Sequence, residues 1–258
     1  VSFFDPISYH EGSVWPLFTG WVSLAEYRAG HPLAGYQHLM QNADLTWAQD
    51  LGDVTELLSG QYFQVLGRST ARQLWSSAMV ISPILRGMFG LEWNAPANTL
   101  TVTPNLPADW ATATVRHIPL GRSAIDLTFT RQGSDWLVTT DGSVHLTSHS
   151  AQAKVAGNTL RIPAPPVEVS IPAGLPTPGA QTEQMKLLNE QRTPHSLTLT
   201  LSAPGSSTQT FSLRENAPRL HVTVDHGQAA SAHDGLRPVT VQFPAGQGYV
   251  TQTVTFSW

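Results

Sequence analysis

The feature that most constrains this chain is a change of hydrophobic period near residue 93. Before that point, apolar residues recur at spacings of three and four, as in helices that bury one face. After it, apolar and polar residues alternate with period two among frequent Pro and Gly, as in half-buried strands. We therefore predict an α+β multidomain chain in which helices precede antiparallel β-sandwich modules. The expected units are residues 1–93, 94–179 and 180–258, the last being a second β-module or a continuation of the sandwich.

Three helices are expected in the first unit. The apolar spacing predicts one that runs from Val14 to about Ala25, with Ser13 as its N-cap. A second should cover residues 33–47. A third should begin near Thr70. Residues 49–69 have mixed periodicity and three glycines, so we interpret them as mostly loop.

The third helix has its own start and break signals. Thr70 and Gln73 match a capping box, and the apolar pattern continues to Gly90 with Pro83 expected to kink it. The predicted helices are apolar over much of their circumference, so they need packing partners. The apolar side chains expected to lack partners within this chain include Trp21, Leu39, Leu74, Ile81 and Leu85.

The remaining sequence predicts short strands separated by turn residues. Asp141-Gly142 is a hairpin signal. Residues 163–179, rich in Pro, Ala and Gly, look like a joint. Almost no helix is expected after residue 93, and a short helix around 182–189 is the main exception considered. The ten segments that alternate most clearly are 99–103, 123–130, 136–140, 143–147, 167–171, 196–201, 208–213, 220–224, 239–243 and 250–256.

Composition excludes several classes of function. Lys and Arg number 14 against 18 Asp and Glu, a net charge of −4 without a basic run, so nucleic acid is not an expected partner. No apolar run approaches the ~20 residues that span a bilayer, so no membrane partner is expected either. Cys is absent and the ten His show no zinc spacing, so we expect no metal and no cofactor. The chain begins at Val1 without a signal-type segment. We interpret it as a piece of a longer protein, and its compartment stays open.

One candidate for chemistry is residues 9–16, YHEGSVWP. They place Tyr9, His10, Glu11 and Trp15 just before and within a helix start, where a loop can hold polar and aromatic groups around a ligand. The alternative interpretation is a capped helix whose Tyr and Trp pack in the core.

A second candidate is residues 53–62, DVTELLSGQY. Glu56 is a carboxylate in an apolar loop, and Tyr62 follows six residues later. Such a carboxylate could be a base with a tuned pKa. The alternative is a surface Glu or a helix cap.

Four segments together resemble a known family. They are YHEGSVWPLFTGW (9–21), GDVTELLSGQYFQ (52–64), WSSAMVISPILRGMFGLEW (75–93) and LTVTPNLPADW (100–110). The first three are similar to the end of the catalytic domain of bacterial amylo-α-1,6-glucosidase, or glycogen-debranching-type, glycoside hydrolases. The fourth resembles the start of the β-sandwich that follows it. The resemblance implies the last helices of an (α/α)6 barrel.

The resemblance also implies a mechanism and site residues. The family inverts the anomeric centre with a general acid and a general base, which inverting enzymes hold about 6.5–9.5 Å apart so that water fits between base and sugar. Glu56 matches the general base. Tyr9, His10 and Trp15 match the sugar-binding loop, and we add Tyr62 and Glu11 to this set, although Glu11 stands where Asn or an aromatic residue is common. The acid has no counterpart here.

The expected function is therefore the C-terminal part of an inverting glycoside hydrolase acting on α-glucosidic, such as α-1,6, linkages of oligo- or polysaccharides. Its missing partner would be the N-terminal part of the barrel, and the chain alone should be inactive. One alternative is a non-catalytic carbohydrate-binding or scaffold β-sandwich module. Another is an α-L-rhamnosidase-like glycosidase, against which the loop at residues 9–15 argues.

Overall fold

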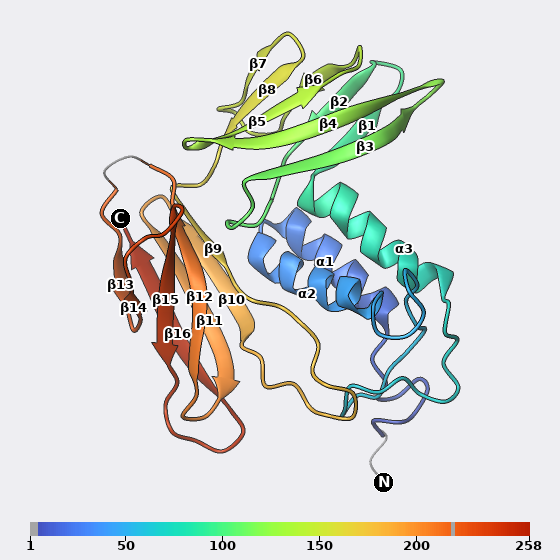
Figure 1. Ribbon diagram of the computed structural model, residues 1–258, viewed down its shortest axis with the longest axis vertical. Helices are drawn as coiled ribbons and strands as arrows, with labels where there is room; N and C mark the ends of the chain where they lie inside the picture. The colour runs from blue at the N-terminus through green and yellow to red at the C-terminus, as the bar shows by residue number, and fades with distance from the viewer. Residues whose placement is uncertain (1–4, 218–219) are drawn as a thin grey trace.

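The computed structural model describes residues 5–217 and 220–258 and shows three helices followed by four β-sheets (Figure 1). The helices are α1 (Pro16–Ala29), α2 (Pro32–Leu45) and α3 (Leu74–Pro83). A five-residue π-helical turn, Ile84–Met88, continues α3. Residues 46–73 contain no helix or strand longer than an isolated bridge, so the predicted loop is confirmed. None of the described helices has both the length and the apolar character needed to cross a bilayer.

Two predicted helix starts are wrong. Ser13 does not cap α1, because the helix begins at Pro16 with Trp15 as N-cap, and the Ser13 hydroxyl donates to the Tyr9 carbonyl instead. Thr70 and Gln73 form no capping box, since α3 begins only at Leu74. Both errors have one cause: the chain before each helix makes tertiary contacts that delay the first turn.

The irregularity expected at Pro83, a kink, takes the form of a change from α-helix to a π-helical turn. Proline lacks the N–H that an α-helical turn needs, and α3 ends at this residue. The Phe89 amide then donates to the Ile84 carbonyl five residues back, at 2.9 Å. This wider turn carries the chain out of the helical part into the first strand.

The first β-unit, β1 to β8, contains two sheets around one hydrophobic core. The sheet orders are β1-β2-β6 and β3-β4-β5-β8-β7. Only the β2–β6 pair in this unit is parallel. The strands are β1 (Leu91–Asn94), β2 (Thr99–Val102), β3 (Thr112–Leu120), β4 (Ser123–Gln132), β5 (Asp135–Thr140), β6 (His145–Thr147), β7 (Lys154–Ala156) and β8 (Thr159–Pro163).

The second β-unit, β9 to β16, repeats this two-layer arrangement around a separate core. Its sheet orders are β10-β11-β16-β13 and β14-β15-β12-β9, all antiparallel. The strands are β9 (Val167–Ser170), β10 (Lys186–Thr193), β11 (Ser196–Pro204), β12 (Thr208–Glu215), β13 (Thr223–Asp225), β14 (Gln228–Ala229), β15 (Leu236–Gln242) and β16 (Tyr249–Ser257).

The predicted β-character is confirmed, since each of the ten segments overlaps a strand. Three details differ. The exception considered at 182–189 is not helical, because its second half lies in β10, which pairs with β11. Asp141-Gly142 forms no hairpin, because β6 leaves β5 and pairs with β2. The boundary between the two β-units lies before β9 and not near residue 179, because β9 pairs with β12 and so belongs to the second unit.

The helices pack between the two β-units (Figure 1). Tyr27 and Leu39 from the helices and Phe89 share the core of the first unit, where the Phe89 and Phe129 rings lie 5.0 Å apart. Toward the second unit, the Gln37 side chain donates to the Met185 carbonyl at 3.1 Å and accepts from the Leu187 amide at 2.9 Å. The helical part is therefore tied to both β-units.

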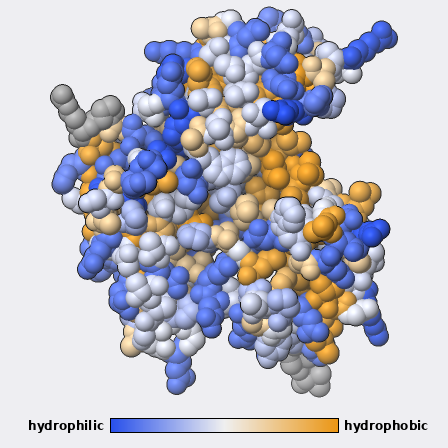
Figure 2. All heavy atoms as spheres, in the orientation of Figure 1, coloured by the Kyte–Doolittle hydropathy of each residue, from blue (hydrophilic) through white to orange (hydrophobic). Residues whose placement is uncertain are grey.

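One face of the helical part stays exposed. Leu74 is 83% exposed, and Trp21 and Ile81 are more than half exposed, as predicted. Leu39, predicted to be uncovered, is only 1% exposed because it lies in the shared core, and Leu85 is half-buried. Hydrophobic residues gather over the helical part on the face seen in Figure 2. The described helices do not close into a barrel.

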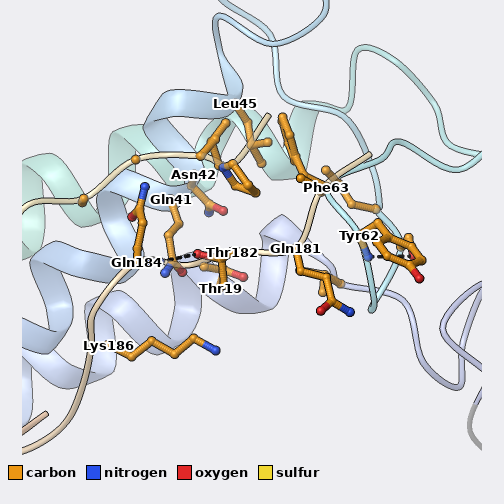
Figure 3. Close-up of a pocket in the computed structure, with 18 of the residues that line it drawn as sticks. Thr19, Gln41, Asn42, Leu45, Tyr62, Phe63, Gln181, Thr182, Gln184 and Lys186 are labelled. Carbon is orange, nitrogen blue, oxygen red and sulfur yellow. Dashed lines mark hydrogen bonds between the residues drawn. The ribbon is translucent and has the colours of Figure 1, made fainter. Parts of the chain in front are cut away.

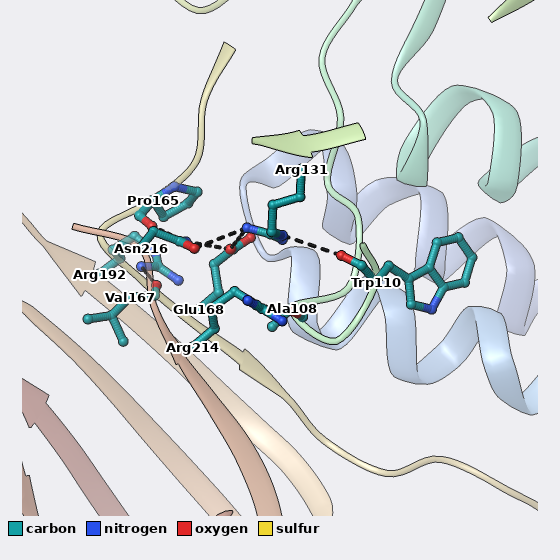
Figure 4. A network of polar contacts seen from close by, with 9 residues as sticks. All are labelled: Ala108, Trp110, Arg131, Pro165, Val167, Glu168, Arg192, Arg214 and Asn216. Carbon is teal, nitrogen blue, oxygen red and sulfur yellow. Dashed lines mark hydrogen bonds and ion pairs between the residues drawn. The ribbon is translucent and has the colours of Figure 1, made fainter. Parts of the chain in front are cut away.

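A buried polar network joins the two β-units (Figure 4). Arg131 of β4 forms an ion pair with Glu168 of β9 at 2.6 Å, and donates to the Asn216 side chain at 3.1 Å. The Arg131 guanidinium also lies 4.3 Å from the centre of the Trp136 ring. The Arg131 and Glu168 side chains are only 6% and 12% exposed. Removing one partner of such a pair leaves the other charge buried without a counter-charge.

Arg131→Met should therefore lower the free energy of unfolding by about 3 kcal/mol, the low end for a broken buried pair, because Asn216 still donates to Glu168. Urea denaturation measures the change. Arg161→Met is the matched control, because the Arg161–Asp135 pair is more exposed and should contribute less than about 1 kcal/mol. An equal loss of unfolding free energy in the two variants would mean that the Arg131–Glu168 pair stabilises the protein no more than the exposed pair does.

Candidate functional site

The two loops singled out from the sequence lie side by side. Val14 and Leu58 exchange backbone hydrogen bonds of 2.8 and 2.9 Å, and the Gly60 amide donates to the Pro6 carbonyl at 2.9 Å. A Cβ at Gly60 would lie 2.0 Å from the carbonyl oxygen of Gly12, so only glycine permits this approach. The pairing brings Glu56 and Tyr9, 47 residues apart, into contact.

Glu56 is a buried carboxylate with donors on both oxygens. It is 5% exposed. The Tyr9 hydroxyl donates to its Oε1 atom, and the Thr70 amide donates to its Oε2 atom at 3.2 Å. The Glu56 amide in turn donates to the Thr70 carbonyl at 2.9 Å. The side chain is therefore held from two segments.

These contacts keep Glu56 ionised. Burial raises the pKa of Glu56, but hydrogen bonds from Tyr9, from the Thr70 amide and from Gln73 lower it, and the net pKa lies below the ordinary value. The hydrogen bond to Glu56 raises the pKa of Tyr9. At neutral pH the pair is thus a carboxylate facing a protonated phenol, since donors favour the charged form of an acceptor.

Aromatic rings surround this pair. The Tyr9 and Trp15 rings meet edge to face at 5.2 Å, and the His10 ring stacks on Trp15 at 5.9 Å. The Trp15 indole N–H donates to the Tyr9 carbonyl at 3.2 Å. Phe18 and Trp21 extend the aromatic series along α1 with centroid separations of 6.0 and 5.5 Å. These rings form a series that runs from Tyr9, beside Glu56, to Trp21 on the exposed face of the helices.

An open cavity of about 710 Å³ adjoins the pair, and Tyr9, His10, Glu11 and Arg68 are among the residues that line it. Glu56 is not among the residues that line this cavity, and it contacts the lining through the hydrogen bond from Tyr9. The structure therefore brings together Glu56, Tyr9, His10 and Trp15, with Glu11 at the rim.

Tyr62 lies apart from this group. It lines a second cavity with Phe63, on the other side of the same loop, and its amide donates to the Ser59 hydroxyl at 3.4 Å. The expected grouping of Tyr62 with Glu56 is therefore not seen.

Sequence reasoning missed the residues that orient Glu56 from the far side. Thr70 and Gln73 match a helix-capping pattern, yet the Thr70 amide donates to Glu56 and Gln73 helps to lower the pKa of Glu56. Ser69 supports the same loop, because its hydroxyl accepts from the Leu57 amide at 3.0 Å and bonds to the Thr55 hydroxyl at 2.6 Å. No spacing in the sequence signals these contacts, since a capping box and a loop anchor use the same residue types.

Comparison with known proteins adds no relative: no family model, no curated protein and no solved structure matches this chain. Within residues 5–217 and 220–258, no cluster of three or more His, Cys, Asp or Glu is arranged to hold a metal ion. The interpretation of the site therefore depends on its own geometry.

Tyr9→Phe should raise the pKa of Glu56, because it removes the donor on Oε1 while burial still disfavours the charged form. A ¹³C NMR titration of the Glu56 carboxyl carbon measures the shift. Tyr62→Phe is the control, since that hydroxyl is remote from Glu56 and its loss should leave the titration unchanged. An unaltered midpoint in Tyr9→Phe would show that the phenol does not govern the ionisation of Glu56.

Proposed function

We propose that this chain supplies the general base and part of the sugar-binding surface of an inverting glycoside hydrolase that acts on α-glucosidic, such as α-1,6, linkages. The observation that carries the proposal is the Glu56 carboxylate, which is kept ionised and oriented by Tyr9 and Thr70 beside an aromatic loop. A base must be deprotonated before catalysis. Aromatic rings offer flat apolar surface to the C–H faces of a sugar.

In this proposal Glu56 activates water. A carboxylate has about four acceptor positions, and the hydrogen bonds from Tyr9 and Thr70 leave room for one from a water molecule. That water attacks the anomeric carbon and its proton passes to Glu56, while a general acid protonates the leaving oxygen on the opposite face. Tyr9 has to move or rotate to admit the water, because Glu56 is buried and contacts the cavity lining through Tyr9.

We further propose that helices outside this chain complete an (α/α)6 barrel and carry the general acid. The support is the exposed apolar face of α1 and α3, which includes Phe18, Trp21, Leu74, Trp75 and Ile81. An apolar face of this kind marks an interaction surface. The β-units would then be sandwich modules that brace the barrel from one side.

A second candidate function is carbohydrate binding without catalysis. The observation in its favour is that Glu56 is buried and is not among the residues that line the cavity. Glu56 would then be a positioning residue, which fixes the Tyr9 ring as part of a sugar-binding surface. The two functions differ in what happens when Glu56 loses its charge but keeps its shape.

In the complete enzyme, Glu56→Gln should lower kcat on isomalto-oligosaccharides by about 10²–10⁴-fold, because it removes a base, while KM and the melting temperature change little. Glu92→Gln is the matched control, an exposed carboxylate of β1 that does not line the cavity at Tyr9. The first product anomer, followed by ¹H NMR, should be β. Full activity in Glu56→Gln, or an α-anomer formed first, would contradict the assignment of Glu56 as an inverting base.

The 258-residue chain by itself should not hydrolyse α-1,6-linked glucans or aryl α-glucosides. A base without a proton donor for the leaving oxygen loses most of the catalysis, and the proposal places that donor on other helices. Release of glucose or of the aryl group measures activity beside the complete enzyme. Turnover within tenfold of the complete enzyme would place both carboxylates in this chain.

A further inference from the structure

A second cavity lies on the opposite side of the Glu56 loop (Figure 3). It measures about 240 Å³ and is bordered by α1, α2, the loop at residues 58–63 and the linker at residues 173–186. At ~30 Å³ of liquid per water molecule, this space equals about eight waters. It is therefore large enough for a small ring but not for a long chain. We call it the amide cavity, after Gln41, Gln181 and Gln184 in its wall.

Two sets of hydrogen bonds fix the walls of the amide cavity. The loop and the linker are joined by bonds of 2.8 Å from the Phe63 amide to the Ala180 carbonyl and from the Gly179 amide to the Phe63 carbonyl. The Tyr249 hydroxyl of β16 donates to the linker carbonyls of Thr182 and Gln184, at 3.0 and 2.9 Å. The cavity is thus built before any ligand arrives, which lowers the entropic cost of binding.

Three amide side chains of the wall are available to a ligand. Within the described part of the chain, the side chains of Gln41, Gln181 and Gln184 make no hydrogen bond to protein. Each offers two N–H donors and one carbonyl acceptor. Figure 3 shows Gln184 and Gln41 toward one end of the cavity, and Gln181 beside the rings of Phe63 and Tyr62 toward the other. Amide groups at both ends and flat apolar surface at one of them suit an amphipathic ring.

The charges of the wall disfavour a cationic ligand. Among the described residues, no carboxylate lines the amide cavity, and the one charged side chain of its wall is Lys186. The Lys186 ammonium lies 4.1 Å from the centre of the Tyr249 ring, a cation–π contact. A cationic ligand therefore finds no counter-charge in this wall and is repelled by Lys186.

We propose that the amide cavity binds a single neutral sugar ring. Gln41, Gln181 and Gln184 would exchange hydrogen bonds with its hydroxyl groups, and the Phe63 ring would lie against its C–H groups. This site is separate from the cavity at Tyr9 and does not use Glu56. It therefore holds a sugar whether or not the proposed catalysis takes place.

The test is a titration of the ¹⁵N-labelled chain with D-glucose and with maltose, followed by two-dimensional NMR. Saturable shifts are expected at the side-chain amides of Gln41, Gln181 and Gln184, with a dissociation constant in the millimolar range. Glucosamine, whose protonated amine carries a positive charge, should bind more weakly. Glu56→Gln should leave the titration unchanged, so failure of this site and failure of the catalytic proposal can be told apart.

The double variant Gln41→Ala/Gln181→Ala should weaken glucose binding at least tenfold. Gln152→Ala, an exposed glutamine outside the cavity, is the matched control and should bind as the parent does. Thr19→Leu narrows the cavity from α1 and should weaken binding in a chain that keeps all three glutamines. The proposal is overturned if no shift saturates, if the shifts fall at His10 instead, if glucosamine binds as well as glucose, or if the double variant keeps the parent affinity.

Discussion

The burial of the Glu56 carboxylate is the constraint around which the N-terminal third of the molecule is arranged. A charged group removed from water must find donors or lose its charge. Tyr9 and Thr70 supply them from segments that are far from Glu56 in sequence. The hydrogen bond from Tyr9 holds the chain before α1 against residues 54–60. The hydrogen bond from the Thr70 amide holds the chain before α3 against the other side of the same segment. The late starts of both helices follow from these contacts.

Buried carboxyl groups also lie where the larger parts meet, and they either find a counter-charge or lose their own. The Arg131–Glu168 pair lies between the β-units. Glu190 of β10 lies against the helices, and its Oε1 atom, 3.8 Å from the Nδ1 atom of His31, has no hydrogen-bond partner among the described residues. Burial raises the pKa of Glu190 to about 7 although Arg192 opposes the shift. Apolar contact alone is non-directional, so these polar groups determine in which orientation the helices and the β-units join.

The loop between α2 and α3 links the two proposed sites. Within this loop, Glu56 and Tyr62 lie six residues apart. Between them, Leu58 forms β-bridges with both Val14 and Val65. Leu58 also packs with Leu45 and Val80 in a small core between the helices. One rigid segment therefore presents a carboxylate to the aromatic loop on one side and a ring to the amide cavity on the other.

Local pattern determined much of this molecule, because periodicity reports which side of a segment is apolar. It placed α1, α2, the loop after them and the strands that alternate clearly, and it singled out Tyr9 and Glu56. Periodicity does not report which strand pairs with which. The sequence around β6 and β9 does not reveal that β6 pairs with β2 or β9 with β12, and helix-favouring residues at 186–189 entered a strand because β11 offered a partner. Thr70 and Tyr62 likewise took their places from the tertiary structure, since hydrogen bonds and cavity walls form between segments that are distant in sequence.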